Sequence, residues 1–181
     1  MTYFLPISDQ NLILTGYIGP NQPLLGRQIA DRLRLPFVNI ENQIAERVGL
    51  PVEEIRIYYG ETRLKSIEAE IIQEAMLRRS TVIRVSGRTL LHGDALAKLQ
   101  QTGTVICLVI GLDAMLQRLH LHLGARYHNP EERALALGQL KREWAVRKME
   151  GIHEINMTYM AEDEVIDTVI SRWQELALVR G

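Results

Sequence analysis

Short apolar runs alternate along the chain with longer segments in which apolar side chains recur at helical spacing. Within residues 24–35, the side chains of Leu25, Ile29 and Leu33 would share one face of a helix, and residues 63–79 show the same period. Five apolar runs are typical of buried strands, at residues 12–15, 37–40, 81–85, 105–109 and 156–160.

This alternation predicts an α/β protein with three α/β/α layers around a parallel, five-stranded sheet. In such sheets ligands bind at the carboxyl ends of the strands. Residues 120–150 interrupt the pattern, because they are polar and rich in Arg and His. We expect this segment to form a mobile helical lid.

Length and composition suit a single domain, residues 1–181, since 46% of the residues are hydrophobic. The 21 Lys and Arg residues against 22 Asp and Glu give a net charge of -1, so the chain lacks the basic field that nucleic-acid binding uses. Cys107 stands alone in an apolar run and predicts a buried strand residue in a reducing compartment. Because a bilayer span needs about 18 apolar residues, which no run approaches, we expect a cytoplasmic protein without membrane partners.

The segment GYIGPNQPLLG, residues 16–26, follows the first predicted strand and has the frame of a phosphate-binding loop. A loop of the G-x-x-x-x-G-K-[ST] type uses glycines to point N–H groups at phosphate, a lysine for the terminal phosphates and a hydroxyl for Mg²⁺. Gly16 and Gly19 supply the turn, and Gly26 allows close packing of the following helix. An ordinary junction between a strand and a helix explains these glycines as well.

The chain lacks the residues with which such a loop binds phosphate and Mg²⁺. Asn21 stands at a glycine position, Gln22 at the lysine position and Pro23 at the hydroxyl position. Asn tolerates a positive φ, and Pro is accepted in the first turn of a helix. The backbone of this segment can therefore keep the conformation of a phosphate loop, although the segment no longer carries the positive charge that attracts phosphate.

The chain resembles the shikimate kinase family in the order and spacing of its motifs from residue 11 to residue 68. The matching pieces are FVNIENQI at 37–44, GLPVEEI at 49–55 and GETRLKSIE at 60–68. The likeness continues through VIRVSGRTLL and RKMEGIHEINM to the C-terminus. It implies a P-loop kinase fold, like that of nucleoside monophosphate kinases, with a pocket for a small acid. It also implies transfer of the γ-phosphoryl group of ATP, with Mg²⁺, to a hydroxyl of a carboxylated ring.

At the positions that this resemblance assigns to the active site, the chain departs from the family. The two acidic positions hold Asn39 and Glu41, and the arginine that grips the substrate carboxylate falls on Lys65, which lacks a two-pronged guanidinium. The glycine triplet near the acid substrate falls on SGR, in which Gly87 is kept and Arg88 brings a bulky cation into the pocket.

Two further arginines match functional positions of the family. Arg126 falls at the lid arginine and Arg147 at a substrate arginine, so some capacity to bind anions can persist.

Other polar residues have plainer explanations. We expect His120, His122 and His128 to be solvated lid residues, since residues two apart on a helix diverge and no acidic or thiol partner completes a metal site. Glu61 and Glu68 are candidate acids, although Glu68 at i,i+3 from Lys65 fits an ordinary surface pair. The basic stretch 140–150 predicts a solvated helix, and two tryptophans, Trp144 and Trp173, predict packing of helices on the sheet or a subunit contact.

The leading hypothesis is a protein of this family whose kinase site has decayed, without a cofactor or metal, and which binds a small anion or a protein partner. The first alternative is an active ATP-dependent and Mg²⁺-dependent kinase of a small acid, in which Arg88, Lys65 or Arg126 replaces the missing charge. The second alternative is a structural protein that forms homo-oligomers.

Overall fold

The computed structural model describes residues 6–16 and 22–180, and of residues 22 and 23 only the backbone. Its strands are β1 (Asn11–Thr15), β2 (Phe37–Asn39), β3 (Val82–Arg84), β4 (Gly103–Val109) and β5 (Ile152–Asn156). Its α-helices are α1 (Gln22–Leu33), α2 (Ile40–Val48), α3 (Val52–Ala75), α4 (Gly87–Leu90), α5 (Ala95–Thr102), α6 (Leu112–Leu123), α7 (Pro130–Trp144) and α8 (Glu162–Arg180). The short 3-10 helices are η1 (Ile7–Asp9), η2 (Gly124–His128) and η3 (Ala145–Lys148).

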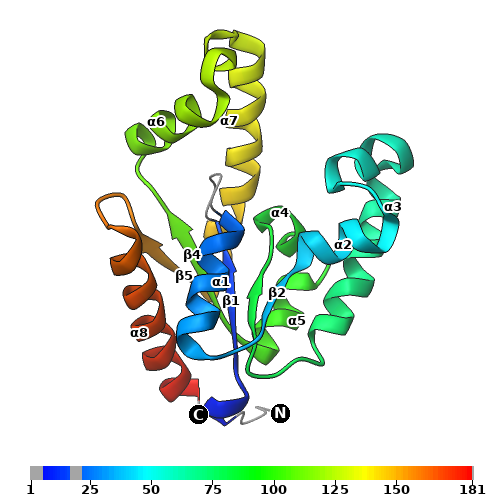
Figure 1. Ribbon diagram of the computed structural model, residues 1–181. Coiled ribbons are helices and arrows are strands. Elements are labelled where there is room, and N and C mark those ends of the chain that lie inside the picture. The colour runs from blue at the N-terminus through cyan, green and yellow to red at the C-terminus, as the bar shows by residue number, and fades with distance from the viewer. Residues whose placement is uncertain (1–5, 17–21, 181) are drawn as a thin grey trace.

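The five strands form one parallel sheet in the order β2-β3-β1-β4-β5, with helices on both faces (Figure 1). The predicted α/β architecture is therefore confirmed. The last strand was placed wrongly by its sequence pattern: β5 spans Ile152–Asn156, not residues 156–160. The strand ends there because the side-chain oxygen of Asn156 accepts a hydrogen bond from the Thr158 amide at 3.0 Å, which turns the chain away from the sheet.

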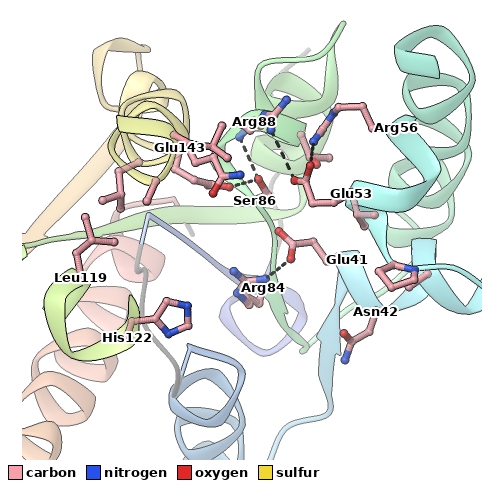
Figure 2. A pocket seen from close by; sticks show the side chains of 18 of the residues that line it. Glu41, Asn42, Glu53, Arg56, Arg84, Ser86, Arg88, Leu119, His122 and Glu143 are labelled. Atoms are coloured by element: carbon pink, nitrogen blue, oxygen red, sulfur yellow. Dashed lines mark hydrogen bonds and ion pairs between the residues drawn. The ribbon is translucent and has the colours of Figure 1, made fainter. Parts of the chain in front are cut away.

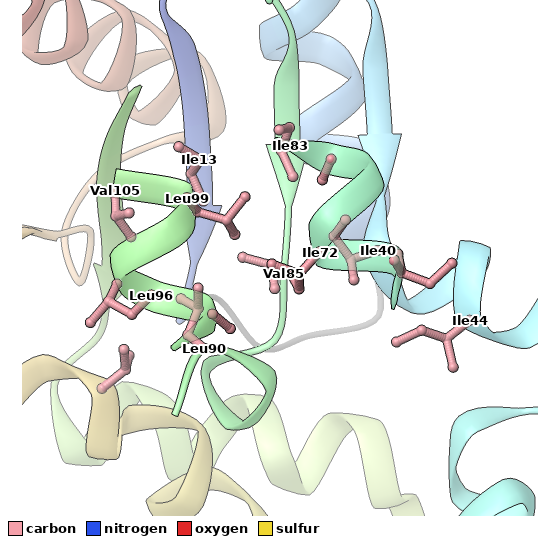
Figure 3. Close-up of a cluster of buried hydrophobic side chains, with 14 of the residues drawn as sticks. Ile13, Ile40, Ile44, Ile72, Ile83, Val85, Leu90, Leu96, Leu99 and Val105 are labelled. Carbon is pink, nitrogen blue, oxygen red and sulfur yellow. The ribbon is translucent and has the colours of Figure 1, made fainter. Parts of the chain in front are cut away.

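Successive side chains of the central strands point to opposite faces of the sheet and form two hydrophobic cores. Ile13 is aligned with Ile83 on one side and Val105 on the other, and these side chains face the layer of α2, α3 and α5 (Figure 3). Leu12 and Leu14 point the other way, toward the core that α1 and α8 cover. Because both faces are covered, β1 and β4 are buried at every position, which explains their continuous apolar runs.

Single residues determine where α2 begins and ends and where α3 is broken. Asn39 begins α2, its side chain accepting a hydrogen bond from the Glu41 amide at 3.1 Å, and Gly49 ends it at φ 83°. The predicted helix at 63–79 is longer at its start and shorter at its end, because α3 runs from Val52 to Ala75. Gly60, at φ 83° and ψ 165°, breaks α3 into two helical pieces.

The segment expected to be a lid, residues 120–150, contains the end of α6, η2, α7 and η3. In Figure 1, α6 and α7 stand on the opposite side of α4 from α2 and α3. Helix α7 begins with Pro130 after Asn129, whose side chain accepts a hydrogen bond from the Glu131 amide at 3.0 Å. Among the described residues, no helix has both the length and the apolar character to cross a membrane.

Candidate functional site

A cavity of about 860 Å³ lies at the carboxyl ends of β2 and β3, where the sequence predicts a ligand site. Helices α2 and α3 line one side and α6 and α7 the other, and the segment after β3 lies between them (Figure 2). The lining residues include four arginines and five glutamates, namely Arg56, Arg84, Arg88, Arg126, Glu41, Glu53, Glu68, Glu132 and Glu143.

Arg84 is the buried cation of this cavity. It is the last residue of β3, and its guanidinium lies 3.2 Å from a carboxylate oxygen of Glu41 (Figure 2). The guanidinium also lies 3.4 Å from the side-chain oxygen of Asn39. Glu41 and Asn39 occupy the positions that the family resemblance assigns to a pair of acids. The structure therefore puts a guanidinium between them.

A second charged cluster joins α3 to α4. Arg56 is bonded to Glu53 at 2.6 Å and to Glu61 at 2.8 Å. Arg88 lies farther from the same two carboxylates, at 3.9 and 4.0 Å. Both arginines are thus matched by glutamates of α3, and Arg88 is the more loosely held.

Glu68 is not the surface residue that its spacing from Lys65 suggests. Its side chain is only 4% exposed and accepts a hydrogen bond from the Thr89 hydroxyl at 3.1 Å. It also makes a short hydrogen bond with Nδ1 of His92. Glu68 therefore ties α3 to the segment that begins at α4, while Lys65 is exposed to solvent.

Glu143, near the end of α7, lies against the start of α4 at the cavity wall (Figure 2). One carboxylate oxygen accepts a hydrogen bond from the backbone N–H of Gly87 at 2.6 Å, and the other accepts a short one from the Ser86 hydroxyl. Burial raises the pKa of Glu143, as does the charge of Glu41, while its two hydrogen bonds and Arg84 act in the opposite direction.

The next residue, Trp144, connects the same helix to the end of β1. Its indole N–H donates a hydrogen bond to the carbonyl of Gly16 at 2.5 Å. Gly16 has φ +83°, and a Cβ there would lie 2.4 Å from the sulfur of Cys107. Glycine is therefore required at position 16, the start of the altered phosphate loop (residues 16–26), because of its positive φ and its close contact with β4.

The other residues of the altered loop are only partly placed. A Cβ on Gly26 would lie 2.6 Å from the Phe37 ring, so this glycine does allow close packing of α1 on β2. Gly19 and Asn21 lie outside the described residues, as do the side chains of Gln22 and Pro23.

Three residues predicted for the pocket do not line it, which corrects their assignment. One of them is Gly87, whose amide is bonded to Glu143, and the other two are Lys65 and Arg147. Lys65 is exposed on α3, and Arg147 is bonded at 2.7 Å to Glu154 of β5, beyond the end of α7. Arg88 and Arg126 do line the cavity, and Arg126 lies 3.6 Å from Glu132. Sequence reasoning missed Arg84 and Glu143. The signal for Arg84 was a charged residue inside the apolar run VIRV, whereas Glu143 looked like one charge among many on a solvated helix.

The remaining predictions concern histidines and tryptophans. The three lid histidines are exposed, and His120 stacks on Tyr127 with ring centroids 4.5 Å apart. Within the described ranges, no three His, Cys, Asp or Glu side chains are grouped as a metal site would need. Trp173 packs α8 on the sheet, where its indole N–H donates to the Asn11 carbonyl at 3.2 Å.

The residues present do not fit Mg²⁺ with ATP. The lysine and hydroxyl of a phosphate loop are replaced by Gln22 and Pro23. The acidic positions offer an amide that caps α2 and a carboxylate already paired with Arg84. A divalent cation bound between Asn39 and Glu41 would face a guanidinium at close range, which disfavours it.

Comparison with known proteins supports the architecture. A family model described as shikimate kinase matches residues 24–174. The shikimate kinase of Thermodesulfovibrio yellowstonii is 26% identical over 171 residues, which are 93% of this chain and 97% of that protein. The shikimate kinase of Geobacter sulfurreducens is 30% identical over 115 residues, 64% of each. The crystal structure of a shikimate kinase from Bacteroides thetaiotaomicron has the same fold, with a TM-score of 0.72 at 22% identity and coverage of 92% of this chain and 97% of that one. Since the family model covers most of the sequence, the chain belongs to the shikimate kinase family.

Proposed function

We propose that this chain binds a small polar molecule in the cavity between α2, α3 and α7, and that it transfers phosphoryl groups from ATP poorly or not at all. The observation that carries this proposal is the placement of Arg84, whose guanidinium lies 3.2 Å from Glu41 and 3.4 Å from Asn39. The positions that would hold Mg²⁺ in an active relative instead hold an internal ion pair.

The altered phosphate loop supports the same conclusion. Phosphoryl transfer depends on positioning and on cations that neutralise the phosphates, and Gln22 and Pro23 supply neither a charge nor a hydroxyl. Removing one preorganised transition-state donor typically lowers turnover by about a hundredfold to a thousandfold. The effects of these losses on turnover are not additive, because the residues belong to one catalytic unit, but each loss lowers turnover.

The direct test is a turnover assay with shikimate, ATP and Mg²⁺, using the Thermodesulfovibrio yellowstonii enzyme as the positive control. We expect turnover at least about a thousandfold below that of the control. Turnover within about tenfold of the control, at matched protein and substrate concentrations, would sink the proposal.

A second candidate is an active ATP-dependent kinase of a small molecule with a rebuilt phosphate site. The names of the relatives favour this candidate over the first, since the curated relatives reported above are called shikimate kinases. The replacement cation would come from Arg88 or Arg126, because both line the cavity whereas Lys65 is exposed outside it. This candidate predicts that Arg88→Ala abolishes turnover and that Lys65→Ala does not.

A further inference from the structure

Arg88 is the cation of the cavity that the protein itself neutralises least. Each of the other three arginines in the lining has a carboxylate oxygen within 3.6 Å. Within the ranges that the structure describes, the guanidinium of Arg88 makes no hydrogen bond, and its nearest carboxylates, those of Glu53 and Glu61, lie 3.9 and 4.0 Å away. The N–H donors of this guanidinium therefore remain for a ligand.

The position of Arg88 makes its charge effective. The residue belongs to α4, lines the cavity and directs its guanidinium toward α3 (Figure 2). Its side chain is only 19% exposed, whereas that of Arg126 is 61% exposed. Because water and salt screen a half-buried charge less than an exposed one, an ion pair with a ligand is stronger at Arg88 than at Arg126.

The groups around Arg88 favour a ligand with a single negative charge. A planar guanidinium matches a carboxylate through two parallel N–H···O bonds. Five glutamates line the cavity against four arginines, so a phosphate group with more than one negative charge would be repelled. The Gly87 amide and the Ser86 hydroxyl are already bonded to Glu143, which leaves the side chain of Arg88 to hold the ligand.

The wall formed by α6 and α7 suits an apolar group. It contributes Leu119, Leu123, Leu135, Ala136 and Leu140 to the lining. A hydrocarbon ring that contacts these side chains would lose apolar surface to water-free packing, which stabilises the complex. The cavity thus offers a cation on one wall and an apolar surface on another.

We propose that Arg88 determines the specificity of the cavity by binding the carboxylate of a small acid with an apolar body. This inference rests on the proposed binding function and names its ligand class. It also moves the cation that holds the acid, because the family resemblance places that cation at Lys65, which is exposed and does not line the cavity. The carboxylate lies between α4 and α3.

Glu61 competes with such a ligand for Arg88. Partial burial acts to raise the pKa of Glu61, but the charges of Arg56 and Arg88 lower it, so its carboxylate is ionised at neutral pH. Neutralising Glu61 should therefore strengthen the binding of an acid. A purely structural role of Arg88 would not produce this effect.

The test compares cyclohexanecarboxylate with cyclohexanecarboxamide, which share a ring and differ in charge. Each compound is titrated into the ¹⁵N-labelled full chain at millimolar concentration and followed by NMR. The signals to follow are the Gly87 amide and the Nε–H of Arg88, which is assigned by its absence in Arg88→Gln. We expect saturable shifts with the carboxylate, and binding of the amide that is weaker by about tenfold or more.

Three variants locate the effect. Arg88→Gln removes the charge, and we expect it to weaken binding of the carboxylate by about tenfold or more. Glu61→Gln can still accept a hydrogen bond from Arg56, and we expect it to strengthen binding by about threefold. Lys65→Gln is the control, and it should bind as the unchanged protein does, because Lys65 lies outside the cavity.

The inference is overturned if the unchanged protein does not bind the carboxylate, or binds the amide equally well. Unaltered binding in Arg88→Gln, or an equal loss in Lys65→Gln, also overturns it. If Arg88→Gln does not fold, the two compounds on the unchanged protein and on Glu61→Gln decide the question. Equal binding of both compounds would leave the proposed binding function standing, and the shikimate turnover assay tests the loss of kinase activity separately.

Discussion

The amide of Gly87 and the carboxylate of Glu143 are joined by a hydrogen bond of 2.6 Å, although the residues are 56 positions apart. This bond attaches α7 to the start of α4, at the edge of the sheet where the cavity lies. Helix α7 is held a second time by the indole of Trp144, which donates to the Gly16 carbonyl at the end of β1. Residues 120–150, which the sequence predicts to be a lid, are thus connected directly to both loops that the family resemblance assigns to ligand binding.

Adding one methyl group at Gly87 should separate α4 from α7. A Cβ at this position would lie 1.9 Å from the backbone oxygen of Glu143, so backbone must shift to admit it. We expect Gly87→Ala to lower the free energy of unfolding by about 1–3 kcal/mol, measured by urea denaturation. Gly138→Ala is the matched control, because a Cβ on that glycine of α7 meets no atom within 4 Å. The Gly138→Ala substitution should leave the free energy of unfolding unchanged or raise it. Equal losses of unfolding free energy in the two variants would contradict the close contact between Gly87 and the backbone of Glu143.

The charge of Glu143 should make stability depend on pH in a definite direction. Burial raises the pKa of Glu143 above the ordinary value of 4.5, so the folded state binds its proton more tightly than the unfolded state. The stabilisation that comes from this tighter proton binding is fully present below pH 4.5. It is lost as the pH rises through the pKa that Glu143 has in the folded state. We expect the free energy of unfolding of the unchanged protein to fall relative to that of Glu143→Gln over this range. A difference that stays constant or grows with pH, in denaturation series on both proteins, would contradict the raised pKa.

Cys107 should be inert in the folded protein. The side chain is fully buried in β4, and burial, together with the charge of Glu154, raises its pKa to about 12. Because the thiolate is the reactive species, a thiol reagent at neutral pH should modify the native chain far more slowly than a small free thiol. Reaction should become rapid in denaturant. Rapid stoichiometric labelling of the native protein would show that β4 is accessible, against the structure.

Restoring the lost loop residues should restore part of the lost binding. The triple variant Asn21→Gly, Gln22→Lys and Pro23→Ser brings back the pattern G-x-x-x-x-G-K-S. We expect it to gain affinity for ATP by about tenfold or more, because a lysine and an N–H donor then face the phosphates. It should remain a poor kinase, since the Arg84 ion pair with Glu41 is unchanged. Full recovery of shikimate turnover in this variant would mean that the ion pair does not obstruct the site.

The fold could be predicted from the sequence because strand and helix periods are local signals. The buried strands β1 and β4 were recognisable as continuous apolar runs, and Gly26 as a site of close helix packing. The structure adds that Phe37 is the residue against which Gly26 packs. The fifth strand was misplaced because an Asx turn at Asn156 is not visible in hydrophobicity.

The site could be predicted only in part, since its contacts are between distant segments. Arg88 was expected in the cavity and lines it. The sequence left Glu68 open between a candidate acid and a surface residue paired with Lys65, whereas tertiary packing turns its side chain toward Thr89 and His92. The contact between Glu143 and Gly87 depends on how α7 crosses α4, which no local pattern encodes.

The most direct measurement of the central claim is calorimetric titration of the purified chain with ATP, with and without Mg²⁺. We expect no detectable heat at millimolar ATP and an unchanged melting temperature, because Gln22 and Pro23 stand where a phosphate loop has its lysine and hydroxyl, and because Glu41 is paired with Arg84. Micromolar binding that requires Mg²⁺ would contradict it, and would mean that another cation of the chain has taken over the task of the missing lysine.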